Sequence, residues 1–200
     1  MECAPVLAAI VDGPPPDTGR VRFLNDLWTV TEWRVWHGDT TGAGRALMLL
    51  RERHPADPPD LAAASEFWAS LLDAMIAVLH DRSDADRLLS DLEAQLAEGL
   101  DPDVQGTEGA IIVARLLEMR GYPKRALEVI RRRPLQEVVT WHLSTRKREE
   151  GRLATIVGDT AAAIAAYAHY LAMRENPEAS IQPEVDRIRD ELRRLTGEGR

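Results

Sequence analysis

Cysteine, lysine and aromatic side chains are scarce in this chain of 200 residues. Cys3 is the single cysteine, which excludes a disulfide framework and a cysteine metal site within the chain. Lys124 and Lys147 are the only lysines among the 25 basic residues, and aromatic residues make up 5% of the sequence. The chain therefore carries almost all of its positive charge on arginine.

Long hydrophobic runs and a signal peptide are also missing from the sequence pattern. No apolar run approaches the roughly 18 to 20 residues that cross a bilayer. The first residues, MECAPVLAAIVDG, lack the basic start of a signal peptide. We therefore expect a cytoplasmic protein with no membrane partner. Its composition, 44% hydrophobic and 29% charged, is ordinary for a globular chain with a buried core.

Motifs that would identify an enzyme or a metal site are absent as well. The five histidines form no HExxH pattern, and the serines lack the paired glycines of a nucleophile elbow. His80-Asp81 resembles a dipeptide of metal-dependent phosphohydrolases, but a capping aspartate at a helix end explains it better. Asp81, Asp84 and Asp86 have the wrong spacing for a calcium loop and suit an acidic helix start. We expect no cofactor, no metal and no catalysis, and keep a cryptic enzyme as the third hypothesis.

Helical periodicity fills most of the chain between turns marked by glycine and proline. The predicted helices span residues 23–37, 43–53, 61–80, 85–98, 107–121, 124–133, 135–143, 149–157, 161–174 and 183–195. Residues 135–143 could also form a strand because of their β-branched residues, but their setting between helices favours a short helix. Asp60 is an expected N-cap, as is Asp159 or Thr160, and Pro123 suits a first turn. The predicted fold is all-α, with residues 1–22, including a triple proline, as an extension or linker and residues 23–200 as a helical-repeat domain.

Four of the predicted hairpins align at their turns. The equivalent turn residues are Gly38, His80, Gly121 and Gly158. Five residues after each comes an alanine, namely Ala43, Ala85, Ala126 and Ala163. Four residues after each alanine comes a larger apolar residue, namely Leu47, Leu89, Ile130 and Tyr167. Such a small-then-large pair would lock the second helix of each hairpin against the first. This recurrence predicts an α-α superhelix of about four hairpins, with residues 183–195 as a C-terminal capping helix.

These hairpins resemble degenerate tetratricopeptide repeats, with the second copy matching poorly because it lacks the turn glycine. The matching residues are Gly151, Gly158-Asp159, Ala163 and Tyr167 in the fourth copy, Ala114, Gly121, Ala126 and Ile130 in the third, and Gly38-Asp39, Ala43 and Pro55 in the first. Residues 152–195 are similar to the helical-repeat tails of bacterial signalling proteins, notably serine/threonine kinases and transcriptional activators. The resemblance implies a partner-binding or regulatory module. It transfers no kinase activity, because the chain has no glycine-rich loop or catalytic-loop motif.

Two groups of residues are candidates for binding a partner. Residues 115–152 carry 11 basic residues against 5 acidic ones, although the net charge of the chain is −8. The candidates in this basic band are Arg131, Arg132, Arg133, Arg146, Lys147 and Arg148. They would steer an acidic protein or peptide partner. The alternative function is a nucleic-acid-associated transcriptional regulator that uses the same band, with Trp141 as a stacking surface, but the acidic net charge disfavours it.

The second group is aromatic and lies near the start of the predicted domain. Trp28, Trp33 and Trp36 fall within nine residues and cannot all face one neighbour on a helix. At least one should be exposed, and Trp33 and Trp36 are the candidate anchors. Cover by the N-terminal extension or by a fused domain is the favoured alternative. We therefore expect a non-catalytic protein-interaction or regulatory scaffold, with the partner and the oligomeric state left open.

Overall fold

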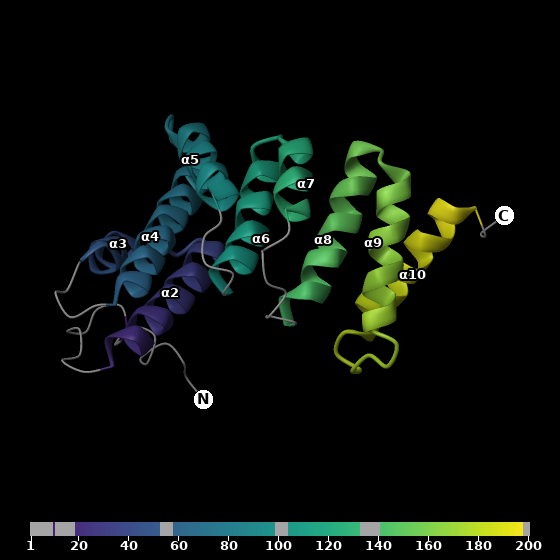
Figure 1. Ribbon diagram of the computed structural model, residues 1–200, viewed down its shortest axis with the longest axis horizontal. Coiled ribbons are helices and arrows are strands. Elements are labelled where there is room, and N and C mark those ends of the chain that lie inside the picture. The colour runs from purple at the N-terminus through teal and green to yellow at the C-terminus, as the bar shows by residue number, and fades with distance from the viewer. Residues whose placement is uncertain (1–9, 11–18, 53–57, 99–103, 133–140, 198–200) are drawn as a thin grey trace. The chain divides into compact units, whose positions relative to one another are not determined.

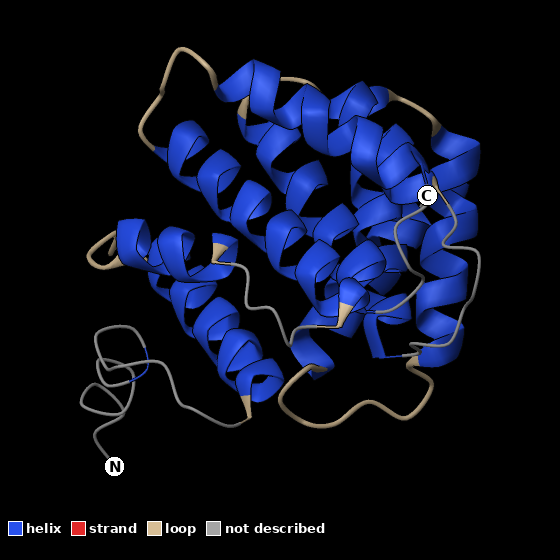
Figure 2. Cartoon of the chain, turned by 60° about the vertical axis from the view of Figure 1, so that its left-hand side comes forward, coloured by secondary structure: helices blue, strands red, loops and turns tan. Residues whose placement is uncertain are grey.

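The protein is represented by a computed structural model that describes residue 10 and residues 19–52, 58–98, 104–132 and 141–197. Every regular element within these ranges is an α-helix, and Figure 2 shows helices joined by loops without a strand. The predicted all-α fold class is therefore confirmed. Two compact units divide the chain, Met1–Leu92 and Glu93–Arg200.

In the first unit, helices α2 (Arg20–Trp36) and α3 (Ala43–Arg51) pack against α4 (Pro59–Leu79), as Figure 1 shows. Apolar residues recur along α4 at three- and four-residue steps, so a broad face of the helix can be buried. The largest buried side chains on it are Phe67, Trp68, Leu71, Leu72 and Met75. Trp68 stacks on Trp28 of α2 with ring centroids 6.3 Å apart and planes 8° apart. This aromatic pair ties the two helices together.

Helix α4 is long and apolar enough to cross a membrane by length and composition alone. This finding corrects the expectation that no segment approaches that length. However, 67% of its most apolar window is buried inside the protein. Burial of this extent is typical of the core helix of a soluble protein.

The second unit contains two helical hairpins and a final helix. Helices α6 (Val104–Met119) and α7 (Pro123–Arg131) form one hairpin, and α8 (Trp141–Val157) and α9 (Thr160–Met173) form the other. Helix α10 (Gln182–Thr196) packs on α9 (Figure 1). Helix α5 (Ala85–Glu98) spans the boundary between the two units.

The contact between α8 and α9 depends on a glycine. A Cβ atom added at Gly151 would lie 2.4 Å from Cδ1 and 2.5 Å from Cε1 of the Tyr167 ring, closer than any real Cβ contact. Tyr167 is 5% exposed, so its ring has little room to move away. Gly151 thus lets a large aromatic side chain of α9 pack directly on the backbone of α8.

Four helix ends share one turn geometry, and one of them corrects the predicted alignment. Gly38, Asp81, Gly121 and Gly158 all have positive φ, between 49° and 83°. In each turn the amide of the next residue donates to a carbonyl five positions back, which is the Schellman pattern. The residue equivalent to the three glycines is therefore Asp81 and not His80. Aspartate tolerates this conformation better than most residues, which hid the equivalence in the sequence.

The alanines predicted to face the helix partners are buried. Ala43, Ala85, Ala126 and Ala163 are at most 2% exposed. Of the larger residues that follow them, Leu89, Ile130 and Tyr167 are also buried, and Leu47 is partly buried. The small-then-large pairs thus occupy packed positions in all four helices, but in the second copy the alanine follows the turn residue Asp81 by four positions and not by five.

Helix α10 has one buried face and one charged face, as the capping-helix prediction requires. Val185 and Ile188 join Tyr167 and Tyr170 in a buried cluster. The opposite side carries ion pairs three residues apart along the helix, Arg189–Asp186, Arg193–Asp190 and Arg194–Glu191. Such a face is suited to water and not to a further packed helix.

Several predicted helix boundaries differ from the observed ones. Helix α2 begins at Arg20, inside the predicted linker, and α6 begins at Val104, three residues before its predicted start at residue 107. Pro58 occupies the N-cap position of α4, so Asp60 lies in the first turn and is not the cap. Asp159 is confirmed as the cap of α9, since its side chain accepts from the Ala162 amide. The helix predicted over residues 135–143 lies mostly outside the described residues, as does most of the segment 1–22, so the predicted domain division stays a prediction.

Candidate protein-interaction surface

The arginines at the end of α7 are held by other parts of the second unit. Arg131 donates to Asp159 at 2.7 Å and lies 3.6 Å from Glu150. Its hydrogen bond is the main reason why the pKa of Asp159 is lowered, with a second contribution from the Ala162 amide. Arg132 donates to the backbone carbonyl of Glu93 at 2.7 Å. Arg133, also predicted as a binding residue, lies outside the described residues.

Arg146 is buried and contacts the end of the neighbouring helix α7. Its side chain is 8% exposed, and its Nε donates to the Ile130 carbonyl at 2.7 Å while Nη2 donates to the Arg132 carbonyl. These are carbonyls of the last turn of α7, which have no partner inside their own helix. A buried guanidinium from α8 therefore caps the negative end of α7.

Lys147 and Arg148 also pair within the second unit. Lys147 donates to Glu150 at 2.8 Å, and Arg148 donates to Glu149 at 3.1 Å and to Glu184 of α10 at 2.5 Å. The predicted basic band is thus interleaved with carboxylates and carbonyls of the same unit. A partner would have to compete with these contacts to use the arginines.

The three tryptophans of α2 differ in solvent exposure, as their helical spacing predicts. Trp28 is 3% exposed, whereas Trp33 is 52% exposed. The Trp33 ring lies against the His37 ring, with centroids 4.2 Å apart, and His37 Nδ1 lies 2.7 Å from the Trp33 carbonyl. Trp36 is partly buried and donates from its indole to Glu32 at 2.9 Å. The prediction that at least one tryptophan is exposed is confirmed.

An exposed apolar pair on α6 and α8 was missed by the sequence reasoning. Met119 and Ile156 are each 50% exposed. Each precedes a turn glycine, Gly121 or Gly158, by two residues, so the two side chains occupy the same position in their helices. The alignment of turns could have identified them, because an apolar residue at the same position in two neighbouring helices is a recognisable signal. We call this surface the α6–α8 face; its residues are Arg115, Glu118, Met119, Glu149, Arg152 and Ile156.

An ion pair joins the two helices of the α6–α8 face. Arg152 Nη1 donates to Glu118 Oε1 at 2.6 Å, and Arg152 Nε donates to Glu149 at 2.8 Å. The hydrogen bond from Arg152 lowers the pKa of Glu118, and the charges of Arg152 and Arg115 lower it further against the opposing effect of burial. Both partners are about one third exposed. Met119 follows Glu118 directly, and Ile156 lies one helical turn after Arg152, so apolar groups flank the pair on both helices.

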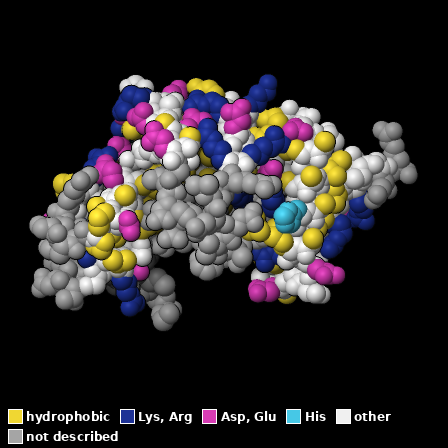
Figure 3. Space-filling view, viewed as in Figure 1, with side chains coloured by type: hydrophobic (Ala, Val, Ile, Leu, Met, Phe, Trp, Pro, Cys, Tyr) yellow, Lys and Arg dark blue, Asp and Glu magenta, His cyan; other side chains and the backbone are white. Residues whose placement is uncertain are grey.

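Helix α9 presents an exposed face of a different kind. It contains no charged residue, and Figure 3 shows hydrophobic side chains gathered over it. Four of its exposed positions are alanines, namely Ala161, Ala165, Ala168 and Ala172. Alanine offers a partner a single methyl group, so this face provides few anchoring contacts compared with the α6–α8 face.

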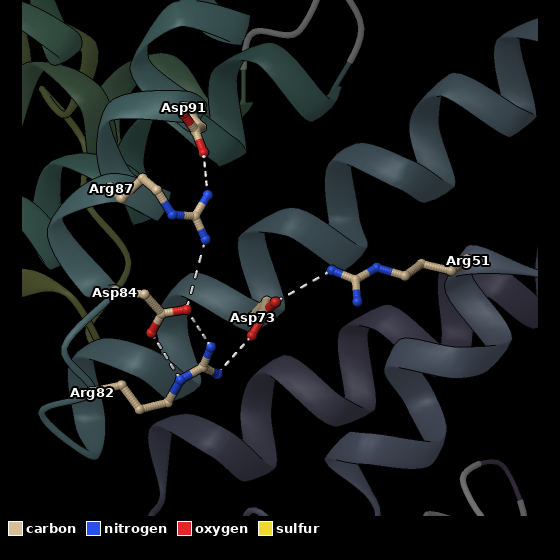
Figure 4. Close-up of polar contacts among 6 residues, drawn as sticks. All are labelled: Arg51, Asp73, Arg82, Asp84, Arg87 and Asp91. Carbon is tan, nitrogen blue, oxygen red and sulfur yellow. Dashed lines mark hydrogen bonds and ion pairs between the residues drawn. The ribbon is translucent and has the colours of Figure 1, made fainter.

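Asp84, one of the three acidic residues considered for a calcium loop, belongs to an arginine network in the first unit. Figure 4 shows Asp73 of α4 between Arg51 and Arg82, at 3.3 Å and 2.7 Å. Arg82 also donates to both oxygens of Asp84, at 3.0 Å and 2.7 Å. This bidentate hydrogen bond is the largest cause of the lowered pKa of Asp84. The network connects α3, α4 and the turn before α5.

Within the described ranges, no group of three or more histidine, cysteine, aspartate or glutamate side chains is arranged to hold a metal ion. Comparison of the chain with protein-family models, with curated proteins and with solved structures gave no match.

Proposed function

We propose that this protein is a non-catalytic protein-interaction module that binds a peptide or an extended segment of a partner through the α6–α8 face. The observation that carries the proposal is the exposure of Met119 and Ile156 at the same position of two neighbouring helices, beside an ion pair that links them. Large exposed apolar side chains with a polar surround are common features of interaction sites.

The size of the two anchors sets the expected affinity contribution. Complete burial of a methionine or isoleucine side chain is worth about 1.5–3 kcal/mol. Because each is already half buried, a partner that covers both would gain about 2 kcal/mol from them. That corresponds to roughly a 30-fold change in Kd. Methionine also adapts its shape to different apolar ligands, which suits a surface that receives a flexible segment.

The arrangement of the helical hairpins into a repeat fold is also part of this proposal. We propose that the hairpins are degenerate tetratricopeptide-like repeats that form a superhelical solenoid. The four equivalent turns and the four buried alanines support this architecture. In such a fold the first helices of successive hairpins form one continuous binding surface, and α6 and α8 are two of these helices.

The nucleic-acid alternative has less support from the contacts of the basic band. Arg131, Arg146 and Arg148 are each bound to carboxylates or carbonyls of the second unit. Phosphate groups would have to displace these partners before the band could act as a continuous positive surface. A cytoplasmic location remains our expectation.

A random peptide library displayed on phage tests the proposal even though the partner is unidentified. We expect peptides with apolar residues to be enriched on the wild-type protein. Their affinity should fall about 30-fold for the Met119→Gln/Ile156→Gln variant, as the burial estimate requires.

Two further samples make the result decisive. Ala165→Gln places the same side chain on the exposed face of α9, and we expect it to bind the peptides as the wild type does. Equal binding by the Met119→Gln/Ile156→Gln variant would refute the assignment of the site. A labelled random-sequence DNA that binds with salt-dependent affinity, together with no peptide enrichment, would favour the nucleic-acid alternative.

A further inference from the structure

Arg187 of α10 has no counter-ion among the residues that the structure describes. It is exposed, and no hydrogen bond or ion pair joins its side chain to any of those residues. Lys124 of α7 is the only other lysine or arginine in the described part of the second unit with this property. In a protein of net charge −8, a guanidinium group in this state is available to an acidic partner.

The carboxylates that Arg187 could reach along α10 are already occupied. On a helix these are Glu184, three residues before it, and Asp190 and Glu191, three and four residues after it. Asp190 and Glu191 are paired with later arginines of α10. Glu184 is bound by the other helices, because Arg148 of α8 donates to its Oε2 at 2.5 Å and a buried tyrosine hydroxyl of α9 donates to its Oε1 at 2.7 Å. Arg187 therefore loses all of its partners within the helix to other side chains.

Arg187 lies beside Arg152, a residue of the α6–α8 face. Helices α8 and α10 run in the same direction (Figure 1), and the contact between Arg148 and Glu184 fixes their register. One helical turn beyond this contact lie Arg152 on α8 and Arg187 on α10. Burial raises the pKa of Tyr167, and the charges of Arg152 and Arg187 oppose this rise, so both guanidinium groups lie near the same hydroxyl group.

The two neighbouring arginines differ in what a partner can bind. Arg152 donates from Nη1 and Nη2 to Glu118 and from Nε to Glu149. A carboxylate of a partner would have to displace these glutamates in order to bind Arg152. No described residue uses the N–H groups of Arg187, and a guanidinium group can bind a carboxylate through two parallel hydrogen bonds. An acidic side chain of the partner is therefore best placed at Arg187.

We propose that Arg187 extends the α6–α8 face onto α10 and binds the carboxylate of an aspartate or glutamate of the partner. The binding role of Arg187 rests on the proposed function, because the peptide that covers Met119 and Ile156 also supplies the carboxylate. The partner is thus an extended peptide that combines apolar residues with an acidic one.

The positions of Arg187 and Ile156 set the spacing of these residues in the peptide. Ile156 lies about 6 Å along α8 from Arg152, and one helix with its side chains is about 10–12 Å wide. The carboxylate and the nearest apolar contact are therefore about 12 Å apart, a distance that about four residues of extended peptide can span. We expect the displayed library to select peptides in which an acidic residue lies about three to five positions from an apolar one.

Paired substitutions in the protein and in the peptide test this contact. The probe is an acidic peptide selected on the wild-type protein, together with the same peptide carrying glutamine at the acidic position. We expect Arg187→Gln to weaken binding of the acidic peptide about fivefold, which is the upper range for an ion pair at an exposed surface. Binding of the glutamine peptide should not change. High salt should reduce the difference between the two peptides, because it screens the ion pair.

Lys124→Gln is the matched control, because it removes the same charge from an exposed residue of α7. It should bind both peptides as the wild type does. Arg187→Gln should unfold at the same urea concentration as the wild type, since no described residue loses a contact. Equal binding of the acidic peptide by Arg187→Gln and by the wild type would overturn the proposal. Equal weakening by Arg187→Gln and Lys124→Gln would also overturn it, because net charge alone would then explain the effect.

The selection separates failure of this contact from failure of the α6–α8 face. Selected peptides that are apolar, that carry no acidic residue at the expected spacing and that bind Met119→Gln/Ile156→Gln weakly would refute the role of Arg187 alone. If no peptide is enriched on the wild-type protein, both the proposed function and the role of Arg187 are wrong.

Discussion

Substitution of Gly151 by alanine gives a quantitative test of the packing between α8 and α9. Replacement of a helical glycine by alanine ordinarily stabilises a protein by up to about 1 kcal/mol. At Gly151 the new Cβ would lie 2.4 Å from the Tyr167 ring, so the ring or a helix must shift. Overpacking of this kind costs about 1–3 kcal/mol, and a contact this close to a buried ring belongs in the upper part of that range. We therefore expect Gly151→Ala to lower the free energy of unfolding by about 1–2 kcal/mol.

A matched control separates this clash from helix propensity. Gly44 is also helical and has ordinary backbone angles, and a Cβ there would meet nothing within 4 Å. Gly44→Ala should therefore stabilise the protein by up to about 1 kcal/mol, so the two substitutions should have opposite signs.

The assay is urea unfolding followed by circular dichroism, with hydrogen exchange at the amides of α8 and α9 to locate the change in the second unit. Gly151→Ala should cost less in a Tyr167→Leu background, because the shorter side chain leaves room for the new methyl group. If Gly151→Ala stabilises the protein as Gly44→Ala does, the close approach of the two helices is wrong.

Three polar contacts can be tested by substitution and by titration. Arg146→Met should lower the free energy of unfolding by about 1–3 kcal/mol, because buried carbonyls at the end of α7 lose their donor. Arg132→Met, which removes an exposed contact, should change the free energy of unfolding by less than about 0.5 kcal/mol in the same urea assay. Equal effects of the two substitutions would refute the capping role of Arg146. Burial and the hydrogen bond to Glu184 raise the pKa of Tyr170 to about 12. The stability that this shift contributes is present below pH 10 and should be lost as the pH rises towards about 12. Tyr170→Phe should not show this loss at high pH. A pKa near 10 for Tyr170, measured by ultraviolet titration, would contradict the prediction. Hydrogen bonds from Arg34, and secondly from Thr41, lower the pKa of Asp39 to about 2. The stabilising contribution of Asp39 should therefore be present above pH 3.8 and be lost as the pH falls to about 2. If NMR shows the same titration of the Asp39 carboxyl in Arg34→Gln as in the wild type, the hydrogen bond from Arg34 is wrong.

Helix positions were predictable from the sequence because they depend on local periodicity and on turn residues. The α5 bounds, the Asp159 cap and the first-turn position of Pro123 agree with the prediction. The second turn was misaligned by one residue, because an aspartate adopts the conformation that glycine adopts in the other three turns. Backbone conformation of this kind depends on the folded context and cannot be read from residue type alone.

The contacts that long charged side chains make in the fold were not predictable from the sequence. Arg146 belongs to a run of basic residues in the sequence, yet it is buried at the end of α7 because the fold brings that helix end next to α8. Sequence spacing along one helix contains no information on such a neighbour. The exposure of Met119 and Ile156 was accessible in principle, because the turn alignment already placed them at equivalent positions. The resemblance to tetratricopeptide repeats stays a prediction.

The binding role of the α6–α8 face is tested most directly by methyl NMR of the wild-type protein during titration with a selected peptide. We predict that the methyl signals of Met119 and Ile156 shift together along one saturation curve. Met48, which is 68% exposed and belongs to the first unit, should not shift. Saturable binding that leaves Met119 and Ile156 unchanged while other signals move would contradict the proposed role of this face.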